Sequence, residues 1–380
     1  MKVLVLKANY FPVCGAGRLL ETMLAHFDRA SVEPVLVEVA TAGQPSSVHF
    51  TSSRLTHLQH HTIAWHGARR SRPAIAALRA LIRTTGAAAV YSHDMRCDLL
   101  CRLAGARRGL GVPWVAHVHG WVGREGSARI RAFEFMDRMC IRSADEVWVG
   151  SQRAVADVRR GLPSRVTLRC FQNALDPAIV GDAAQQSAAA RIALGLPAGA
   201  FAVGMHARLH PAKGHALLAE AVLRCAEKRV HAILLGYGDE EANLRRLAAS
   251  PRAAGRIHVI GRQEPRDTLA TVGALDLFVY ASLRESLPLA VLEAMLLKRP
   301  IVSTDVGDVR SALDHGKAGV LVPPGDVPAM AAAIDALASD PAQRTALAAR
   351  AYDIAKTRFS PARLGAEATA GFVALCGGRQ

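Results

Sequence analysis

The chain has 380 residues, of which 51% are apolar, so it is long enough for two domains that each bury a core. No run of about 18 apolar residues occurs, which argues against a membrane-spanning helix. The formal net charge is +15 and comes mainly from residues 1–173, where 24 Lys and Arg face 12 Asp and Glu, so we expect an anionic partner.

We do not expect that partner to be a nucleic acid, because only 5% of the residues are aromatic and no recognition motif occurs. The seven cysteines are scattered. Cys97 and Cys101 would share a helix face, but they lack the further His or Cys ligands of a zinc site. Free thiols are typical of a reducing compartment, so we predict a cytoplasmic protein without a bound metal. The opening MKVLVLKANYFP fits a first strand better than a signal peptide.

Apolar strands alternate with amphipathic helices along the whole chain. Continuous apolar strands separated by helices are typical of parallel sheets that are covered on both faces. The pattern starts afresh after residues 169–177, so we predict an α/β protein with two doubly wound, Rossmann-like domains, 1–173 and 174–355. A C-terminal helix in 356–380 is expected to pack back on the first domain. The carboxyl ends of the strands should face a shared ligand-binding cleft.

Glycines follow the first predicted strand in CGAGRLL, residues 14–20. Gly15 and Gly17 would allow the backbone to approach a ligand closely, although Leu20 replaces the third glycine of a dinucleotide fingerprint. A tight turn without a ligand is the alternative. Residues 57–66, HLQHHTIAWH, are rich in histidine, and we expect a loop or a helix surface there rather than a metal site.

Polar residues end two later strands of the first half. Asp94 follows one of them and is a weak candidate for contacting an acceptor. His117 and His119 lie on one face of the next strand, but no carboxylate or third His completes a metal site nearby. Residues 124–142 mix apolar side chains with arginines. This fits either an amphipathic helix at an anionic membrane surface or a helix packed on the core.

The second half contains a strand, a loop and a helix start in GMHARLHPAKGHALLAEA, residues 204–221. Arg208 and Lys213 would lie at the carboxyl end of a parallel strand, where they could neutralise a departing diphosphate without a metal. Solvated surface cations are the alternative. Gly236 ends the following strand but belongs to no dinucleotide fingerprint, because Glu241 takes the place of the last glycine.

The segment RESLPLAVLEAM, residues 284–295, places Glu293 within an apolar helix, where an unpaired carboxylate is unfavourable. Pro288 suits the first turn of that helix. Helical side chains lean towards the N-terminus, so Glu293 should point to the same helix end as Glu285 in the preceding loop.

A nucleoside-diphosphate sugar would satisfy both carboxylates. Its diphosphate would lie at the helix N-terminus, where unpaired amides and the helix dipole attract anions. The backbone there belongs to Leu287, Pro288 and Leu289. The ribose would bond to Glu293 and the sugar to Glu285, with about 1.5–3 kcal/mol for each charge-assisted hydrogen bond. The alternative is that Glu293 is an ordinary helix carboxylate paired with Lys298 or Arg299.

These motifs resemble those of the retaining glycosyltransferases of family 4, which have the GT-B fold. The resemblance is strong over about residues 200–360 and weak in the first half. It places the two cations that hold the donor diphosphate on Arg208 and Lys213, and the paired glutamates of the family on Glu285 and Glu293.

The glycine turn and late loop of the family are matched by residues 304–326, with one departure. The family usually has a second Gly and then Glu in that turn, whereas Asp308 and Ser311 stand there in this chain. The contact that the Glu would make is therefore not expected here.

In the first half, the resemblance gives a role to His119, which would lie near the transferred sugar. It also implies that the Gly15–Gly17 loop faces the donor phosphates. The base would be bound by backbone near Arg262 and Gln263. The first domain would then bind the acceptor, and the second domain would bind the donor.

We therefore predict a retaining, metal-independent glycosyltransferase that needs no cofactor and uses a UDP- or GDP-sugar. Its acceptor would be a saccharide or a lipid-linked saccharide of cell-envelope, lipopolysaccharide or polysaccharide biosynthesis, and the basic first half favours a phosphorylated one. Peripheral contact with the inner face of the membrane is expected from the same charge. The alternatives are a GT-B-fold epimerase, which needs no acceptor, and a donor-binding protein without catalysis.

Overall fold

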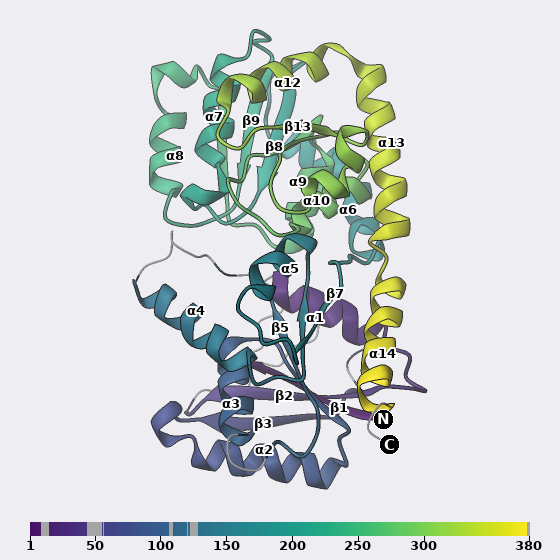
Figure 1. Ribbon diagram of the computed structural model, residues 1–380. Coiled ribbons are helices and arrows are strands. Elements are labelled where there is room, and N and C mark those ends of the chain that lie inside the picture. Colours follow the sequence, from purple (N-terminus) through teal and green to yellow (C-terminus); the bar gives the residue numbers. More distant parts are fainter. Residues whose placement is uncertain are drawn as a thin grey trace. The chain divides into compact units, whose positions relative to one another are not determined.

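The structure is a computed structural model that describes residues 1–8, 15–43, 55, 57–105, 109–119, 121 and 128–377. The chain divides into two compact units. One comprises Met1–Asn173 with Pro361–Gln380, and the other comprises Ala174–Ser360. In Figure 1, each unit is a sheet with helices on both of its faces. No helix in the described part of the chain is long and apolar enough to cross a membrane.

The first unit is built on a parallel sheet whose described strands follow the order β3-β2-β1-β4-β5-β6-β7. Its strands are β1 (Lys2–Ala8), β2 (Glu33–Thr41), β3 (His60–Trp65), β4 (Ala89–Ser92), β5 (Trp114–Val118), β6 (Glu146–Val149) and β7 (Thr167–Cys170). Its helices are α1 (Gly15–Ala25), α2 (Arg72–Thr85), α3 (Met95–Gly105), α4 (Ala128–Ile141), α5 (Gln152–Arg159) and α14 (Pro361–Gly377). The inner strands are buried along their length, as their unbroken apolar runs predicted.

The second unit contains a parallel sheet with the order β10-β9-β8-β11-β12-β13. Its strands are β8 (Phe201–His206), β9 (Val230–Leu235), β10 (Ile257–Gly261), β11 (Leu277–Tyr280), β12 (Ile301–Thr304) and β13 (Val320–Val322). Its helices are α6 (Ala178–Ala193), α7 (His215–Arg224), α8 (Glu241–Ala248), α9 (Pro265–Gly273), α10 (Leu289–Leu296), α11 (Val309–Ala312), α12 (Val327–Ser339) and α13 (Pro341–Arg358). One continuous apolar core joins this sheet to its helices.

The C-terminal helix α14 belongs to the first unit, where it packs beside α1. The ring of Phe372 is fully buried against the rings of Phe27, Tyr91 and Trp148. Gly365 permits the close approach of the two helices, because a Cβ there would lie only 2.0 Å from the carbonyl oxygen of His26. Aromatic packing and one glycine contact thus fix the end of the chain on the first sheet.

Two segments differ from the expectations drawn from the sequence. Residues 57–66 are not a loop or a helix surface, because they contain the edge strand β3, in which Ile63 and Trp65 are buried and Ala64 between them is exposed. The last helix begins at Pro361, a few residues later than the predicted start at 356.

Candidate active site

The second sheet has a topological switch point between its neighbouring strands β8 and β11. From β8 the chain continues to β9 and β10 on one side, and it then returns to β11 on the other side. The chain thus leaves β8 and β11 in opposite directions along the sheet, and such a switch point is where open α/β sheets bind their ligands. Arg208 and Lys213 follow β8, and Glu285 follows β11, so the structure brings three predicted site residues to this edge.

Lys213 and Glu285 meet directly, because the Nζ of Lys213 forms an ion pair with Oε1 of Glu285. The same carboxylate oxygen accepts hydrogen bonds from the hydroxyls of Tyr280 at 2.6 Å and Ser282 at 3.2 Å. Burial, together with the charge of Glu285, raises the pKa of Tyr280 well above its usual value, so its hydroxyl stays a donor. Three donors therefore hold Glu285 in one place.

The backbone also joins the two loops. The amide of Leu283 and the hydroxyl of Ser282 both donate to the carbonyl oxygen of Ala212, at 2.8 and 3.0 Å. Gly214 has a φ of +76°, and a Cβ there would lie 2.0 Å from the carbonyl oxygen of Ala281. A glycine is required directly after Lys213, because only glycine combines this backbone conformation with such a close approach.

Glu293 lies on α10 with only 1% of its surface exposed. Its Oε2 is 2.7 Å from Nε2 of His206, the last residue of β8. The carboxylate therefore reaches the carboxyl end of the central strand, as the lean of helical side chains predicted. Next to this pair, burial lowers the pKa of His215 to about 4, so that imidazole is neutral.

The alternative partners considered for Glu293 are engaged elsewhere. The ammonium of Lys298 lies 4.6 Å from the centre of the Tyr352 ring. The guanidinium of Arg299 donates to the carbonyl oxygen of Leu275 at 2.9 Å. Glu293 is therefore not paired with Lys298 or Arg299, and the alternative interpretation is wrong.

The helix next to Glu285 begins one residue later than predicted, because Pro288 precedes α10 rather than occupying its first turn. No side chain caps this N-terminus, although Leu287, Pro288 and Leu289 lie there as expected. An uncapped helix start of this kind can hold an anion through its amides. The role of this helix start towards a phosphate group stays a prediction.

The turn that departs from the family pattern packs against the loop of Glu285. Gly307 has a φ of +55°, and a Cβ there would lie 2.1 Å from the carbonyl oxygen of Ser286. The amide of Asp308 donates to that same carbonyl oxygen at 2.7 Å. The hydroxyl of Ser311 accepts a hydrogen bond from Arg358. Both departing residues thus have contacts within the second unit.

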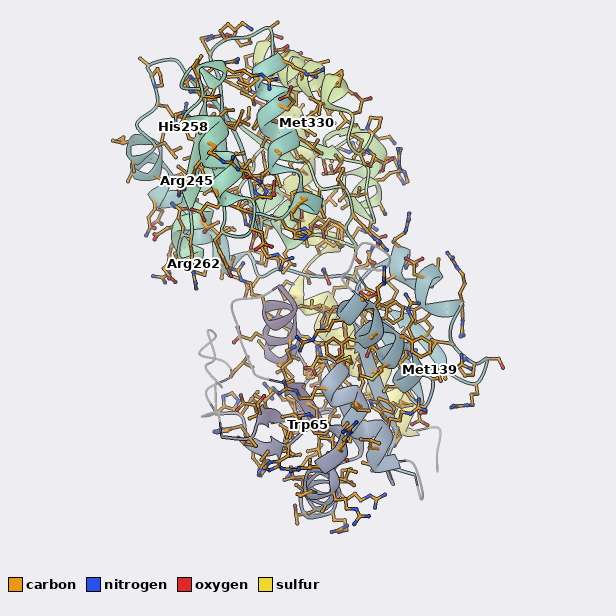
Figure 2. The ribbon with its side chains drawn as sticks, turned by 90° about the vertical axis from the view of Figure 1, so that its left-hand side faces the viewer. Trp65, Met139, Arg245, His258, Arg262 and Met330 are labelled. Atoms are coloured by element: carbon orange, nitrogen blue, oxygen red, sulfur yellow. The ribbon has the colours of Figure 1, made fainter. Side chains whose placement is uncertain are left out.

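The other predicted residues of the second unit lie at the same edge. Arg208 is exposed, and the described residues offer it no ion pair. Gly236 allows a close backbone approach, because a Cβ there would lie 1.9 Å from the carbonyl oxygen of Ala207. Arg262, labelled in Figure 2, stacks 5.1 Å from the centre of the Tyr237 ring. The amide oxygen of Gln263 accepts a hydrogen bond from Thr271 at 3.2 Å.

The switch point of the first sheet lies between β1 and β4. Asp94 follows β4 and accepts hydrogen bonds from the amides of Ala8, at 2.7 Å, and of Arg96 and Cys97, at the start of α3. The ammonium of Lys7 lies 3.4 Å from the same carboxylate. These contacts explain Asp94 as a structural brace, and its role towards an acceptor stays a prediction.

Three histidines gather at the carboxyl ends of β4 and β5. The Nδ1 of His93 is 3.2 Å from Nε2 of His119, and the rings of His117 and His119 stack at 4.4 Å. His93, which follows another strand, thus adds a third histidine beside His117 and His119 that their own segment of sequence does not contain. Even so, the described residues contain no group arranged to hold a metal ion. Burial lowers the pKa of all three, that of His119 to about 3, so they are neutral near pH 7.

The predicted glycine loop of the first unit lies partly outside the described residues, which exclude 9–14. Gly15 and Gly17 fall in the first turn of α1 rather than in a loop. Gly120, which follows His119, also lies outside the described residues. The role of this segment towards donor phosphates remains a prediction.

Sequence reasoning missed four residues of these two edges. All four lie at the end of a strand or just after it. They are His93, His206, Tyr280 and Ser282. That position was visible in the sequence, because polar residues follow apolar runs there. Their partners were not visible, because His93 and His206 meet residues that are distant in the chain, and the hydroxyls of Tyr280 and Ser282 reach Glu285 only through the turn of the loop after β11.

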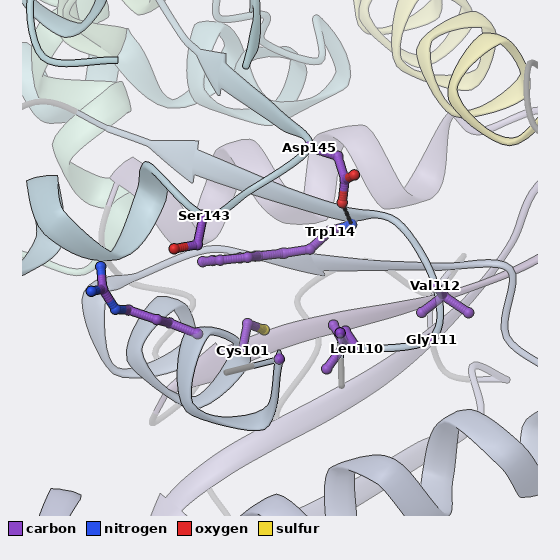
Figure 3. Close-up of a pocket in the computed structure, with 10 residues that line it drawn as sticks. Cys101, Leu110, Gly111, Val112, Trp114, Ser143 and Asp145 are labelled. Carbon is purple, nitrogen blue, oxygen red and sulfur yellow. Dashed lines mark hydrogen bonds between the residues drawn. The ribbon is translucent and has the colours of Figure 1, made fainter. Parts of the chain in front are cut away.

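A pocket of about 670 Å³ in the first unit lies away from the carboxyl ends of the strands (Figure 3). It is lined by residues from the end of α3, including Cys101, by Trp114, the first residue of β5, and by Asp145, which directly precedes β6. The amide of Trp114 donates to the carboxylate of Asp145 at 2.9 Å. Because this is the amino-terminal edge of the sheet, we do not assign the pocket to a donor or an acceptor.

Models of two protein families match the chain. The one described as a glycosyl transferase 4-like domain matches residues 15–173, and the one described as glycosyl transferases group 1 matches residues 200–340. The chain belongs to the group 1 glycosyltransferases of family 4. The predicted family is therefore confirmed in both halves of the chain.

Curated relatives of this glycosyltransferase match it over part of their length. It is 35% identical over 170 residues to the lipopolysaccharide core biosynthesis glycosyltransferase LpsE of Rhizobium meliloti (strain 1021), a match that covers 45% of this chain and 49% of LpsE. It is 25% identical over 287 residues to the alpha-D-kanosaminyltransferase of Streptomyces kanamyceticus. This match covers 73% of this chain and 71% of that transferase. The match thus spans about half the length of LpsE.

Solved structures show the fold over nearly the whole glycosyltransferase. Anabaena HepE in complex with UDP superposes with a TM-score of 0.81 at 21% identity, over 98% of this chain and 100% of HepE. The apo form of the lipopolysaccharide outer core galactosyltransferase WaaB gives a TM-score of 0.72 at 14% identity, over 98% and 100%. The predicted GT-B fold is confirmed.

Proposed function

We propose that the protein is a retaining glycosyltransferase that moves a sugar from a nucleoside-diphosphate sugar to a saccharide or lipid-linked acceptor. The observation that carries the proposal is that two contacts lie at the switch point of the second sheet: the ion pair of Lys213 with Glu285, and the contact of the buried Glu293 with His206. Similar proteins support the substrate class, since HepE was solved with UDP and with UDP-glucose. LpsE, a relative, takes its name from lipopolysaccharide core biosynthesis, which supports an acceptor of the cell envelope.

Each residue of this edge suits one part of such a donor. Lys213 and Arg208 carry the positive charge that a diphosphate needs, and the uncapped start of α10 adds amides. Glu293 would accept hydrogen bonds from ribose hydroxyls and Glu285 from hydroxyls of the sugar. Because Glu285 is already held by Tyr280 and Ser282, it would keep its position when Lys213 turns to the diphosphate.

The proposed reaction breaks the bond between the anomeric carbon and the diphosphate oxygen, and the electron pair leaves with the diphosphate. Lys213 and Arg208 stabilise the charge that develops there, so we expect the reaction to proceed without a metal. The acceptor hydroxyl attacks the same face of the sugar, and its proton passes to the departing phosphate oxygen. His119 is proposed to bind the sugar as a neutral imidazole, in keeping with its lowered pKa.

The test begins with the thermal stability of the protein in the presence of UDP, GDP, ADP and dTDP and of their common sugar conjugates. A ligand that binds the native state raises the Tm according to its concentration and affinity. The best conjugate is then incubated with and without lipopolysaccharide core fragments and polyprenyl-linked saccharides, and the products are separated by mass. Transfer to an acceptor, with the anomeric configuration retained, is the expected result.

Two outcomes would replace the proposal. Conversion of the donor sugar to an epimer without any acceptor would show a GT-B-fold epimerase. Donor binding with neither transfer nor slow hydrolysis would show a protein that only binds the donor. The second outcome has some support in the sequence, because Asp308 and Ser311 depart from the family pattern.

A further inference from the structure

We propose that the solvent face of α4 docks on an anionic lipid surface. This helix of the first unit exposes four large apolar side chains, which is unusual for a surface helix: Phe133, Phe135, Met136 and Met139. Phe135 is the most open of them, at 64% exposed. Contiguous exposed apolar side chains on one element mark a surface that binds something else.

Three of these four side chains share one face of the helix, whereas Phe133 lies to the side of it, with the guanidinium of Arg129 5.5 Å from the centre of its ring. Ala132, Phe135, Met136 and Met139 follow the spacing i, i+3, i+4 and i+7, which places them in a single stripe, and all four are exposed. The opposite side, with Asp137 and Ile141, is buried on the first unit. The stripe therefore faces away from the core to which the helix is attached.

Charge is arranged around this stripe in the pattern that an anionic surface requires. Arg131 lies on one side of the stripe and Arg129 on the other, and both are exposed. The acids of the helix lie on the far side, where the buried Asp137 accepts a hydrogen bond from Trp121 at 2.8 Å. An apolar stripe bordered by arginines suits the boundary between lipid headgroups and acyl chains.

The arrangement favours a lipid surface over a second copy of the chain. A symmetric dimer through this face would bring arginines against arginines around the stripe, with no exposed acid on the helix to pair them. An anionic bilayer supplies phosphate to the arginines and an apolar interior to Phe135 and Met139 (the latter labelled in Figure 2). The excess of cations in residues 1–173 acts in the same direction.

Sedimentation with lipid vesicles tests the proposal without any measurement of transfer, so its result is independent of the proposed function. Vesicles of phosphatidylcholine alone are compared with vesicles that contain 30% phosphatidylglycerol. We expect the protein to partition onto the anionic vesicles at least tenfold more strongly, and 0.5 M salt should weaken this binding.

Variants then locate the surface. Phe135→Ser with Met139→Ser should reduce partitioning at least tenfold, and Arg129→Gln with Arg131→Gln about tenfold or more, since each cation near the surface contributes about fivefold. Ile192→Ser removes an 81% exposed apolar side chain from the second unit and should change nothing.

A second pair of exposed arginines in the first unit serves as the control for charge. Arg69→Gln with Arg70→Gln removes the same charge from another exposed part of the first unit and should have a much smaller effect. Equal partitioning on both kinds of vesicle, or unchanged partitioning of the α4 variants, would overturn the proposal. So would light scattering that shows a dimer which the Phe135 and Met139 substitutions dissociate. Circular dichroism confirms that each variant is folded.

Discussion

The side chains of Lys213 and Glu285 form an ion pair that joins the loop after β8 to the loop after β11. The two residues are 72 positions apart in the chain, and each side chain is more than two thirds buried. Open α/β sheets bind ligands at such a switch point, so this pair marks the edge at which we expect the donor to bind. In the proposed function, Lys213 of this pair supplies the positive charge for the diphosphate.

Replacement of Lys213 by alanine removes the proposed charge on the leaving diphosphate. Loss of one preorganised group of this kind costs about 10²–10³ in kcat, or roughly 2.7–4 kcal/mol. We therefore expect the release of nucleoside diphosphate from the donor to slow by at least a hundredfold, while circular dichroism shows a folded protein. Lys317→Ala is the matched control, because Lys317 is an exposed lysine of the same unit. Near-normal turnover of Lys213→Ala would refute its role.

Replacement of Glu293 by glutamine tests the proposed ribose contact. A lost charge-assisted hydrogen bond of about 1.5–3 kcal/mol should weaken UDP or GDP binding roughly 10- to 150-fold in isothermal titration. The 2′-deoxy and 3′-deoxy nucleotides provide the control. The wild type should bind at least one of them more weakly than the ribonucleotide, and Glu293→Gln should lose most of that difference. If the variant still distinguishes them as the wild type does, Glu293 contacts something else.

Gly214→Ala tests whether the close approach of the two loops needs glycine. Gly199 has nearly the same φ, +72° against +76°, but a Cβ there would have nothing within 4 Å. Gly199→Ala should therefore lower the free energy of unfolding by only the cost of a left-handed alanine, about 1–2 kcal/mol. Gly214→Ala should cost about 1–3 kcal/mol more, because the backbone at Ala281 must move. The midpoints of urea unfolding measure this difference. Equal midpoints for the two variants would contradict the close approach of Gly214 to Ala281.

Two neighbouring buried acids, Asp98 of α3 and Asp137 of α4, predict that the stability of the protein depends on pH. Asp98 and Asp137 are both buried, and desolvation raises the pKa of each above its usual value. The folded state then holds protons that the unfolded state releases, so these groups stabilise the protein at low pH. Their contribution falls as the pH rises above the unfolded pKa near 3.8.

Asp137→Asn should therefore raise the Tm more at pH 8 than at pH 5, because the amide can still accept the bond from Trp121 but carries no charge. Asp157→Asn, at an exposed site, serves as the control and should shift the Tm by a similar amount at both pH values. A loss of stability in Asp137→Asn that is equal at pH 5 and pH 8 would argue against the buried charge.

The sequence predicted both sheets, because unbroken apolar runs such as residues 3–6 and 277–280 are visible without a structure. It also placed Lys213, Glu285 and Glu293 at one edge, since each follows or faces a strand end. It missed β3, where two histidines begin the strand and hide its alternation.

The contacts of the site could not be predicted in the same way. His206 and Glu293 lie 87 positions apart, and only the pairing of β8 with β11 and the packing of α10 bring them together. His93 joined His119 for a similar reason, because parallel strands align residues that are distant in the chain. Periodicity identifies a strand end, but it does not tell which other strand end lies beside it.

The most direct test of the account is hydrogen–deuterium exchange of the full chain with and without saturating UDP and GDP. Binding at the switch point of the second sheet predicts slower exchange in residues 207–214 and 283–293, and Lys213→Ala should need more ligand for the same protection. Binding that leaves these two segments unprotected, or protection confined to the pocket beside Trp114, would contradict the account.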